Sequence, residues 1–275
     1  MTPETKGIRI LLIGSGGREH ALAWKLSQAQ SAEHIFVFPG NGATSQTDKV
    51  SNVATEVEIA DGDYSCLVSL AKELNIGLVV VGPDSVVVDG IEAYFRESKY
   101  LLHNSILIVV MLIVNKVEFP VSALRRNQLN SRVPRRLPKS SCSSMAFRRL
   151  PMMLLLSQDT DLTAILLACT NGSLDKIEIQ IRPGYACNVV VSASGYPEPY
   201  QTGKTIHISP TDPSDVQICH AGTKRLGDVL QSAGGRVLSV AAYGESLEEA
   251  VQRAYDGVDK VSFEGMYFRK DIAAR

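Results

Sequence analysis

Apolar positions in the first third of the chain follow two alternating spacings. Ile8–Ile13, Ile35–Phe38 and Gly77–Val81 are short runs of nearly continuous apolar side chains, many of them β-branched. Such runs are typical of strands that are buried on both faces of a parallel sheet. Residues 67–74 and about 88–99 carry apolar side chains at helical spacing, which predicts a helix in each. The alternation is that of βαβ units and predicts an α/β fold.

The last part of the chain has shorter strand-like runs and one amphipathic helix. The helix is predicted over Glu245–Tyr255, where the apolar side chains recur every three or four residues. The strand-like runs are Cys187–Ala193, Thr205–Ile208, Val216–His220 and Arg236–Ala242. We therefore expect a second, small α+β or half-barrel domain.

The pattern changes between these two regions. Ile106–Val114 is apolar without a break, which predicts a buried strand and is too short for a membrane helix of roughly 20 residues. From Pro120 to Gln158 there is no acidic residue, whereas arginines accumulate. This composition is compatible with a disordered segment or with a nucleic-acid-binding arm. Only Phe147 could stack on bases there, so we favour disorder.

Composition and charge exclude several classes of protein. A chain of 275 residues, 45% of them apolar, can form two domains, and its net charge of −1 favours no polyanionic partner. The five cysteines are scattered without a C-x-x-C pair, so neither a disulfide framework nor a zinc site is expected. The first residues lack the apolar core of a signal peptide. We expect a cytoplasmic protein with neither a nucleic-acid nor a membrane partner.

The most informative motif is the glycine-rich turn that follows the first strand. Gly14, Gly16 and Gly17 precede a helical run, so the backbone could approach an anion at the helix N-terminus, and Arg18 could add a guanidinium. The alternative is that these glycines only allow the strand and helix to pack closely. The motif is not a dinucleotide fingerprint, because Glu19 stands where G-x-G-x-x-G has its third glycine. NAD binding is therefore not expected.

Two further loops should lie beside this turn. Residues 39–44 follow the second strand, and residues 82–85 follow the run Gly77–Val81. Loops after parallel strands gather at one edge of an open sheet, where ligands bind. The three loops should therefore share one mouth.

These residues carry a resemblance to a known family. Residues 13–26 (Ile-Gly-Ser-Gly-Gly-Arg-Glu-His-Ala-Leu-Ala-Trp-Lys-Leu), 39–42 (Pro-Gly-Asn-Gly) and 80–84 (Val-Val-Gly-Pro-Asp) resemble the N-terminal domain of the phosphoribosylamine–glycine ligase family. The family usually has Glu where this chain has Asp84, and Pro-Leu in place of Val86-Val87. The third loop is therefore the weaker match.

The other end of the chain resembles the C-terminal domain of the same family. The matching motifs are Ala186–Tyr200, His220–Thr223, Gly234–Leu238 and Phe263–Asp271, in the family's order and at about its spacing. Residues 154–167 resemble the last helix of the family's ATP-grasp domain, and no other part of that domain is recognisable. The metal-ligand motif Glu-Phe-Asn-x-Arg-Phe-Gly-Asp is missing from the sequence.

The resemblance implies a chemistry that this chain does not fully support. The family uses ATP and Mg²⁺ to activate the carboxylate of glycine as an acyl phosphate, which the amine of phosphoribosylamine attacks. We find no groups for ATP or Mg²⁺, assign no catalytic residue or metal ligand, and expect no ligation. The alternative is a non-enzymatic product of a shortened gene model, or a remnant that binds a phosphoribosyl ligand. The oligomeric state cannot be inferred.

The resemblance assigns the sugar phosphate to the three loops and to one turn near the C-terminus. For that turn, Gly234–Arg236, a simple hairpin is the open alternative. The substrate-binding residues expected are Gly14, Gly16, Gly17, Arg18, Glu19, Pro39, Gly40, Asn41, Gly82, Pro83, Asp84, Gly235 and Arg236.

A specific hypothesis concerns the middle of the chain, residues 101–151. Lys139–Pro151 can be written in codons that, read from the third base of Lys139, give Glu-Phe-Met-Leu-Leu-His-Gly-Ile-Pro-Thr-Ala, which is similar to an ATP-grasp motif of the family. We therefore expect residues 101–151 to be a frame-shifted or intron-derived linker without regular structure. The other expected units are a substrate-binding domain (1–100), an ATP-grasp remnant (152–182) and the C-terminal domain (183–275).

Overall fold

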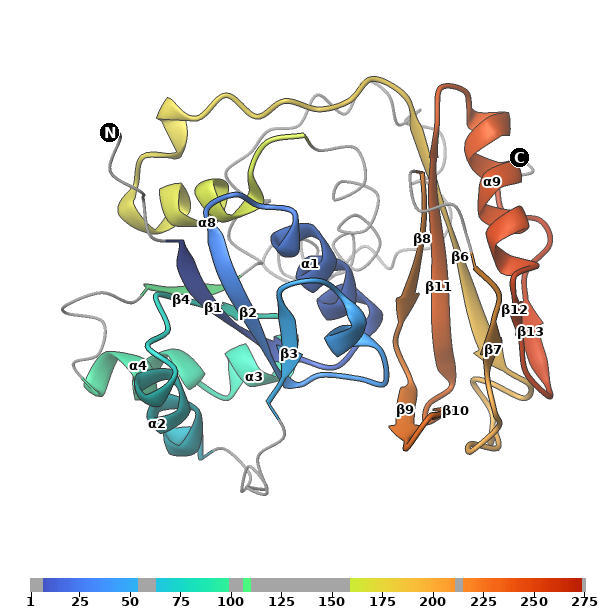
Figure 1. Cartoon of the computed structure of the whole chain (residues 1–275), viewed down its shortest axis with the longest axis horizontal. Helices are drawn as coiled ribbons and strands as arrows, with labels where there is room; N and C mark the ends of the chain where they lie inside the picture. The colour runs from blue at the N-terminus through green and yellow to red at the C-terminus, as the bar shows by residue number, and fades with distance from the viewer. Residues whose placement is uncertain (1–6, 54–62, 99–105, 110–158, 211–214, 274–275) are drawn as a thin grey trace, which may run out of the picture.

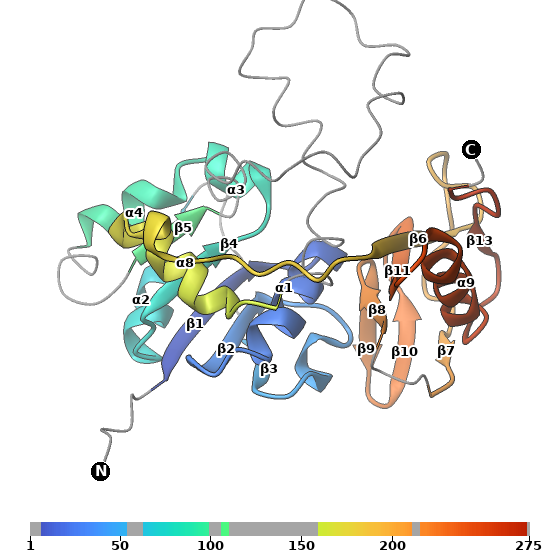
Figure 2. The same cartoon turned by 90° about the horizontal axis from the view of Figure 1, so that it is seen from above.

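The chain folds into two regions that lie side by side (Figure 1). The structure, a computed structural model, describes residues 7–53, 63–98, 106–109, 159–210 and 215–273. The N-terminal region is an α/β unit, and the C-terminal region is an antiparallel sheet with one long helix (Figures 1 and 2). The predicted fold class is therefore confirmed.

Five parallel strands form the N-terminal sheet, in the order β3-β2-β1-β4-β5. The strands are β1 (Ile8–Gly14), β2 (Ala32–Pro39), β3 (Val50–Asn52), β4 (Leu78–Val81) and β5 (Ile106–Val109). β5 is an edge strand paired to β4 and lies where the apolar run Ile106–Val114 predicts a strand, within the segment 101–151 that we otherwise expected to be irregular. The rest of that segment lies outside the described residues, so its irregularity stays a prediction.

Successive side chains of the central strands pack into two separate cores. Ile10 and Leu12 of β1 belong to one core and Leu11 and Ile13 to the other, because neighbouring residues of a strand point to opposite faces. Helices α1 (Gly17–Ser27) and α8 (Leu162–Asn171) contribute to the first core, and α2 (Ser65–Glu73) and α4 (Ile91–Glu97) contribute to the second. The continuous apolar runs of the sequence follow from this burial on both faces.

The helix predicted over about residues 88–99 is present as α4 and is shorter than predicted. The structure has two short helices, α3 (Asp84–Val88) and α4, with Gly90 between them at φ +84°. This left-handed conformation ends α3 and turns the chain, and glycine adopts it without a steric cost. The segment therefore bends where apolar spacing alone predicted a continuous helix.

The segment that resembles an ATP-grasp helix packs on the N-terminal region. Leu162 and Leu166 of α8 lie in the same core as Ile10 and Leu12. The Asp161 carboxylate caps α8 by accepting from the Ala164 N–H (3.0 Å) and from the Ser31 hydroxyl (2.9 Å). This end of α8 is thus fixed to the loop before β2.

The C-terminal region is a four-stranded antiparallel sheet in the order β13-β6-β11-β8. Helix α9 (Leu247–Val258) packs on one face, as the apolar spacing predicts, and its N-cap is Ser246, whose hydroxyl accepts from the Glu249 N–H (3.1 Å). The strands of the sheet are β6 (Tyr185–Ala193), β8 (Val216–His220), β11 (Arg236–Gly244) and β13 (Met266–Phe268). The smaller strands are β7 (His207–Ile208), β9 (Thr223–Leu226), β10 (Val229–Ser232) and β12 (Val261–Ser262).

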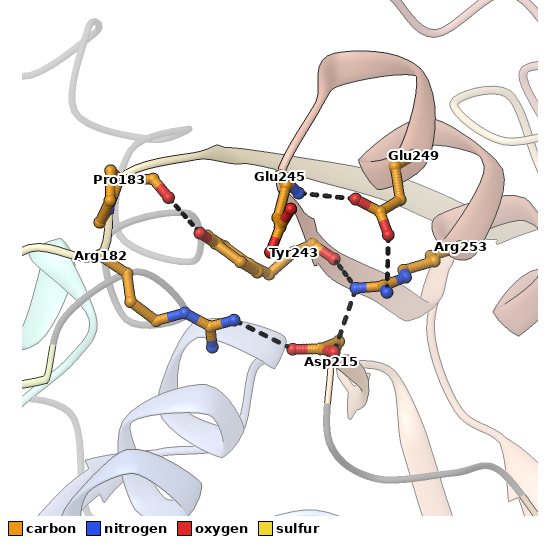
Figure 3. Close-up of polar contacts among 7 residues, drawn as sticks. All are labelled: Arg182, Pro183, Asp215, Tyr243, Glu245, Glu249 and Arg253. Atoms are coloured by element: carbon orange, nitrogen blue, oxygen red, sulfur yellow. Dashed lines mark hydrogen bonds and ion pairs between the residues drawn. The ribbon is translucent and has the colours of Figure 1, made fainter.

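A polar cluster fixes the connection from α8 to the C-terminal sheet (Figure 3). The Arg182 guanidinium lies 3.7 Å from the centroid of the Tyr243 ring, and the Tyr243 hydroxyl donates to the Pro183 carbonyl. Asp215 joins two cations, with 3.3 Å to Arg182 and 3.1 Å to Arg253. The connection is therefore attached to the start of β6 by one aromatic contact and one shared carboxylate.

We expect Arg253→Met to lower the free energy of unfolding by about 1–2 kcal/mol, because Arg253 also donates to the Tyr243 carbonyl (2.9 Å) and pairs with Glu249 (2.7 Å). The matched control is Arg269→Met. Arg269 pairs with Asp271 across an exposed site, so its loss should cost at most about 0.5 kcal/mol. Urea denaturation measures both values, and equal values would contradict the cluster's role. The Arg269–Asp271 contact is bidentate, through Nε (2.8 Å) and through a terminal guanidinium nitrogen (2.7 Å).

Two properties of the described residues concern membrane-spanning helices and disulfides. None of their helices is long and apolar enough to cross a membrane. Cys66, Cys169, Cys187 and Cys219 are not in disulfides. Cys142 lies outside the described residues.

Candidate functional site

The structure brings the three predicted loops together at the carboxyl edge of the parallel sheet. The Gly40 N–H donates to the Gly14 carbonyl (3.2 Å), which joins the loop after β2 to the glycine turn. The Arg18 guanidinium donates to the Gly82 carbonyl, which joins the loop after β4 to the same turn. The shared mouth inferred from strand order is thus present in the fold.

Glu19 lies inside the glycine turn. Its side chain is buried, and its carboxylate accepts from the Gly16 N–H (2.8 Å) and from Arg18 Nε (3.0 Å). A carboxylate is favourable there because the N-terminus of α1 carries partial positive charge. Glu19 thus neutralises part of the anion site that the sequence predicted.

The glycines of the mouth accommodate this carboxylate. A Cβ atom built at Gly14, Gly16 or Gly82 would lie within 3.0 Å of a Glu19 side-chain atom. The close-packing alternative kept open for Gly14, Gly16 and Gly17 agrees with the first two, and Gly82 packs against Glu19 in the same way. A ligand at this turn would meet its outer side, where Ser15 is exposed and Gly17 and Arg18 are half-buried.

Asn41 connects three backbone segments. Its side-chain N–H groups donate to the Ser15 carbonyl (3.0 Å) and to the His220 carbonyl (2.8 Å), and its Oδ1 accepts from the Ala43 N–H (3.2 Å). Asn41 is buried, and its bonds to the His220 carbonyl and the Ala43 N–H are shielded from water. Asn41 thus positions the mouth, a role different from the direct ligand contact expected from the sequence.

The remaining residues of the mouth are more accessible. Pro39 is exposed, and Gly40 has φ +74°, with Asn52 and Thr44 side chains where a Cβ would lie. Pro83 is half-buried and precedes α3.

Gly235 and Arg236 lie on the C-terminal side of the mouth. Gly235 packs against the Tyr196 ring, where a Cβ atom would overlap the aromatic carbons. Arg236 is exposed at the start of β11, and its carbonyl accepts from the Gly222 N–H (2.9 Å). Gly222 lies in the connection between β8 and β9, next to His220, whose carbonyl accepts from Asn41. The structure therefore places Arg236 beside this connection, on the C-terminal side of the mouth.

Sequence reasoning missed a buried histidine pair at the same place. His20 of α1 and His220 of β8 stack with ring centroids 5.3 Å apart, and the His220 N–H donates to Nδ1 of His20 (3.1 Å). Burial lowers the pKa of His20 to about 4 and that of His220 to about 3. Both rings are therefore neutral near pH 7. The signal in the sequence was that each histidine lies in a motif of the family resemblance.

The described residues hold no cluster of candidate metal ligands. Within them, no group of three or more His, Cys, Asp or Glu side chains could hold a metal ion. Mg²⁺ on nucleotide phosphates is held by one or two protein carboxylates, and the buried carboxylate of the mouth, Glu19, is already bound to Gly16 and Arg18. We therefore derive no step through ATP or Mg²⁺.

Two family models match the two regions of the chain. The C domain of phosphoribosylglycinamide synthetase matches residues 186–275, and the N domain matches residues 8–103. The chain belongs to the phosphoribosylglycinamide synthetase family. The resemblance inferred from the motifs at both ends of the chain is confirmed.

Curated proteins of the phosphoribosylglycinamide synthetase family match this chain with different identities and over different shares of their length. A phosphoribosylamine–glycine ligase of Chlorobaculum tepidum is 48% identical over 118 residues, which are 42% of this chain and 28% of that protein. One from Allochromatium vinosum is 23% identical over 98% of both chains. A bifunctional purine biosynthetic protein of Pichia angusta is 25% identical over 98% of this chain and 54% of its own length. The chain thus spans about half of that bifunctional relative.

Solved structures share the fold. A phosphoribosylamine–glycine ligase from Thermotoga maritima superposes with a TM-score of 0.61 at 17% identity, covering 96% of this chain and all of that one. The biotin carboxylase domain of a 2-oxoglutarate carboxylase from Hydrogenobacter thermophilus gives 0.54 at 9% identity, covering 97% and 95%. At these identities the likeness concerns the fold alone.

Proposed function

We propose that this chain binds a phosphoribosyl group at the glycine-turn mouth and does not ligate glycine to phosphoribosylamine. Family membership supports the first half, because the N-terminal and C-terminal domains that resemble the family's substrate domains are both present. The small-molecule partner is then phosphoribosylamine or a related sugar phosphate. We also propose a cytoplasmic location.

The second half of the proposal is that the chain does not ligate glycine to phosphoribosylamine. The length of its alignment with a full-length relative supports this. The match to the Allochromatium vinosum ligase extends over 425 positions, whereas this chain has 275 residues, so at least 150 positions have no counterpart here. The two family models leave residues 104–185 between them unmatched. In the resembled family this interval holds the ATP-grasp domain. Phosphoryl transfer needs metal-bridged phosphates and cations around them, which such a loss would remove.

We assign the phosphate of the ligand to the outer side of the α1 N-terminus. Gly16 and Gly17 are partly accessible there, and Arg18 supplies a guanidinium fixed by Glu19. Across the mouth, Pro39, Gly40 and Pro83 border the same edge, with Asp84 beginning α3. Gly235 and Arg236 enter the proposal as the rim contributed by the C-terminal region.

Titration of ribose 5-phosphate into the purified chain, followed calorimetrically at pH 7.5, tests the binding. We expect saturable binding that weakens at least tenfold, or about 1.4 kcal/mol, in Arg18→Met. Arg9→Met is the control, because Arg9 pairs with Glu33 at the other end of β1 (2.9 Å). Absence of binding in the unchanged chain, or equal loss in both variants, would contradict the proposal.

The second candidate is a non-enzymatic product of a shortened gene model. The unmatched interval 104–185 favours it, and it contains most of the segment 101–151 that we propose to be frame-shifted or intron-derived. Sequencing the genomic DNA and the spliced transcript across this interval decides the origin. Codons for Lys139–Pro151 that do not spell the shifted motif would end the hypothesis.

A further inference from the structure

We infer that His20 and His220 form an acid-sensitive contact that holds the N-terminal and C-terminal regions together. This inference concerns the contact between the two regions and is independent of ligand binding at the mouth.

The two regions meet along α1 and the loop after β8. Helix α1 packs against β8, and a Cβ at Gly17 would lie 3.5 Å from the Ala221 Cβ. Cys219 of β8 is fully buried and belongs to the core of the N-terminal sheet. In Figures 1 and 2, α1 lies on one side of the C-terminal sheet and α9 on the other. The C-terminal sheet thus uses an N-terminal helix as its second cover.

Three hydrogen bonds between the two regions reinforce this contact, which we call the seam; one is between backbone groups and two run from side chains to backbone carbonyls. The Gly42 N–H donates to the Thr223 carbonyl (3.2 Å), and Arg225 Nε donates to the Gly42 carbonyl (3.0 Å). Asn41 adds its bond to the His220 carbonyl. None of these three bonds involves an imidazole, so none of them changes when a histidine is protonated.

The hydrogen bond between the two histidines requires a neutral ring. Nδ1 of His20 is an acceptor for a backbone N–H, and a proton on that nitrogen would turn it into a second donor facing the first. A charge on either ring would also be buried beside the other ring, at 5.3 Å. Protonation of His20 or His220 therefore costs free energy when the two regions are in contact, and does not when they are apart.

The surrounding ionisable groups do not offset this cost. Arg225 of β9 is a cation near His220 and disfavours a second positive charge. Glu19 of α1 is bound to Gly16 and Arg18. Burial raises the pKa of the Cys219 thiol to about 12, so it stays neutral. The seam holds no carboxylate placed to neutralise a histidinium among these groups.

The sign of the pH dependence follows from the lowered pKa values. We call the protein closed when the two regions are in contact and open when they are apart. Above pH 6.5 the histidines are neutral in both states, so the contact has its full strength. Below pH 6.5 the open state takes up protons and the closed state does not until about pH 4 for His20 and about pH 3 for His220. Each histidine should therefore favour opening roughly 30-fold more at pH 5 than at pH 7.5.

Two buried cysteines report opening without any added label. Cys219 lies in the seam, and Cys187 lies in the core of the C-terminal region itself. We would treat the chain with 4,4′-dithiodipyridine between pH 7.5 and pH 4.5 and measure each site by mass spectrometry. The ratio of Cys219 to Cys187 modification cancels the pH dependence of thiol chemistry and of global unfolding. We expect this ratio to rise at least tenfold by pH 5.

Asparagine variants separate the effect of histidine protonation from the effect of side-chain shape. His20→Asn and His220→Asn keep an acceptor atom near the place of Nδ1 and cannot be protonated, so the double variant should show a constant ratio. His207→Gln, at an exposed histidine of β7, should behave as the unchanged chain. If the double variant does not fold, the single variant His20→Asn should lose about half of the logarithmic change. Identical pH profiles with and without the histidines would overturn the inference, whatever the outcome for ribose 5-phosphate.

Discussion

Replacing Gly82 by alanine is expected to lower the free energy of unfolding of the N-terminal region by about 2–4 kcal/mol. The new Cβ would overlap the Glu19 carboxylate, which is buried and already bound to Gly16 and Arg18, so it has little freedom to move. Gly82 also donates its N–H to the Ile13 carbonyl (2.9 Å), which limits movement of the backbone. Chemical denaturation followed by circular dichroism measures the loss.

A double-mutant cycle identifies the cause. Glu19→Ala removes the overlapping group, so adding Gly82→Ala to it should cost at least about 1 kcal/mol less than in the unchanged chain. Gly90→Ala is the control for backbone strain alone, because Gly90 has φ +84° and no atom within 4 Å of its Cβ position. We expect about 1 kcal/mol there. Additive costs at Gly82 and Glu19 would contradict the packing that we describe.

Asn41→Ala should be the most damaging single truncation of a polar side chain at the seam, at about 3 kcal/mol. The change leaves the Ser15 and His220 carbonyls and the Ala43 N–H without their side-chain partner in a buried place. The same variant should raise the ratio of Cys219 to Cys187 modification at pH 7.5, because one of the lost bonds joins the two regions. Denaturation and thiol modification measure the two effects separately.

Asn171→Ala is the matched control for this prediction. Asn171 is exposed at the end of α8 and bonds only locally, to Ser173 among the described contacts. Its loss should cost at most about 0.5 kcal/mol and leave Cys219 protected. Asn41→Ala would refute the positioning role if it left both the stability and the Cys219 protection unchanged.

The sequence predicted the parts of the fold in which one residue pattern decides the structure. β1 and β4 are buried on both faces and therefore appear as continuous apolar runs, and α9 shows its buried stripe directly. β9 and β10 were missed because Lys224 and Arg225 interrupt any apolar alternation in a hairpin that is mostly exposed. The break at Gly90 was missed because the spacing of apolar residues continues across it.

The mouth was predicted correctly in its location and less well in its interior. Glycines after a buried strand, together with two more loops at strand ends, were enough to place three loops on one edge. A carboxylate that fills the glycine turn cannot be inferred from spacing, because Glu19 has the same position whether it faces a ligand or the turn. The histidine pair is separated by 200 residues, and only tertiary packing brings it together.

The most direct test of the proposed function is a ligation assay. The purified chain would be incubated with freshly formed phosphoribosylamine, glycine and Mg²⁺–ATP, and glycinamide ribonucleotide would be measured by mass spectrometry. A full-length family member serves as the positive control. The proposal predicts no product above the enzyme-free background, even where ribose 5-phosphate binds. Product that forms in proportion to the amount of chain would contradict it.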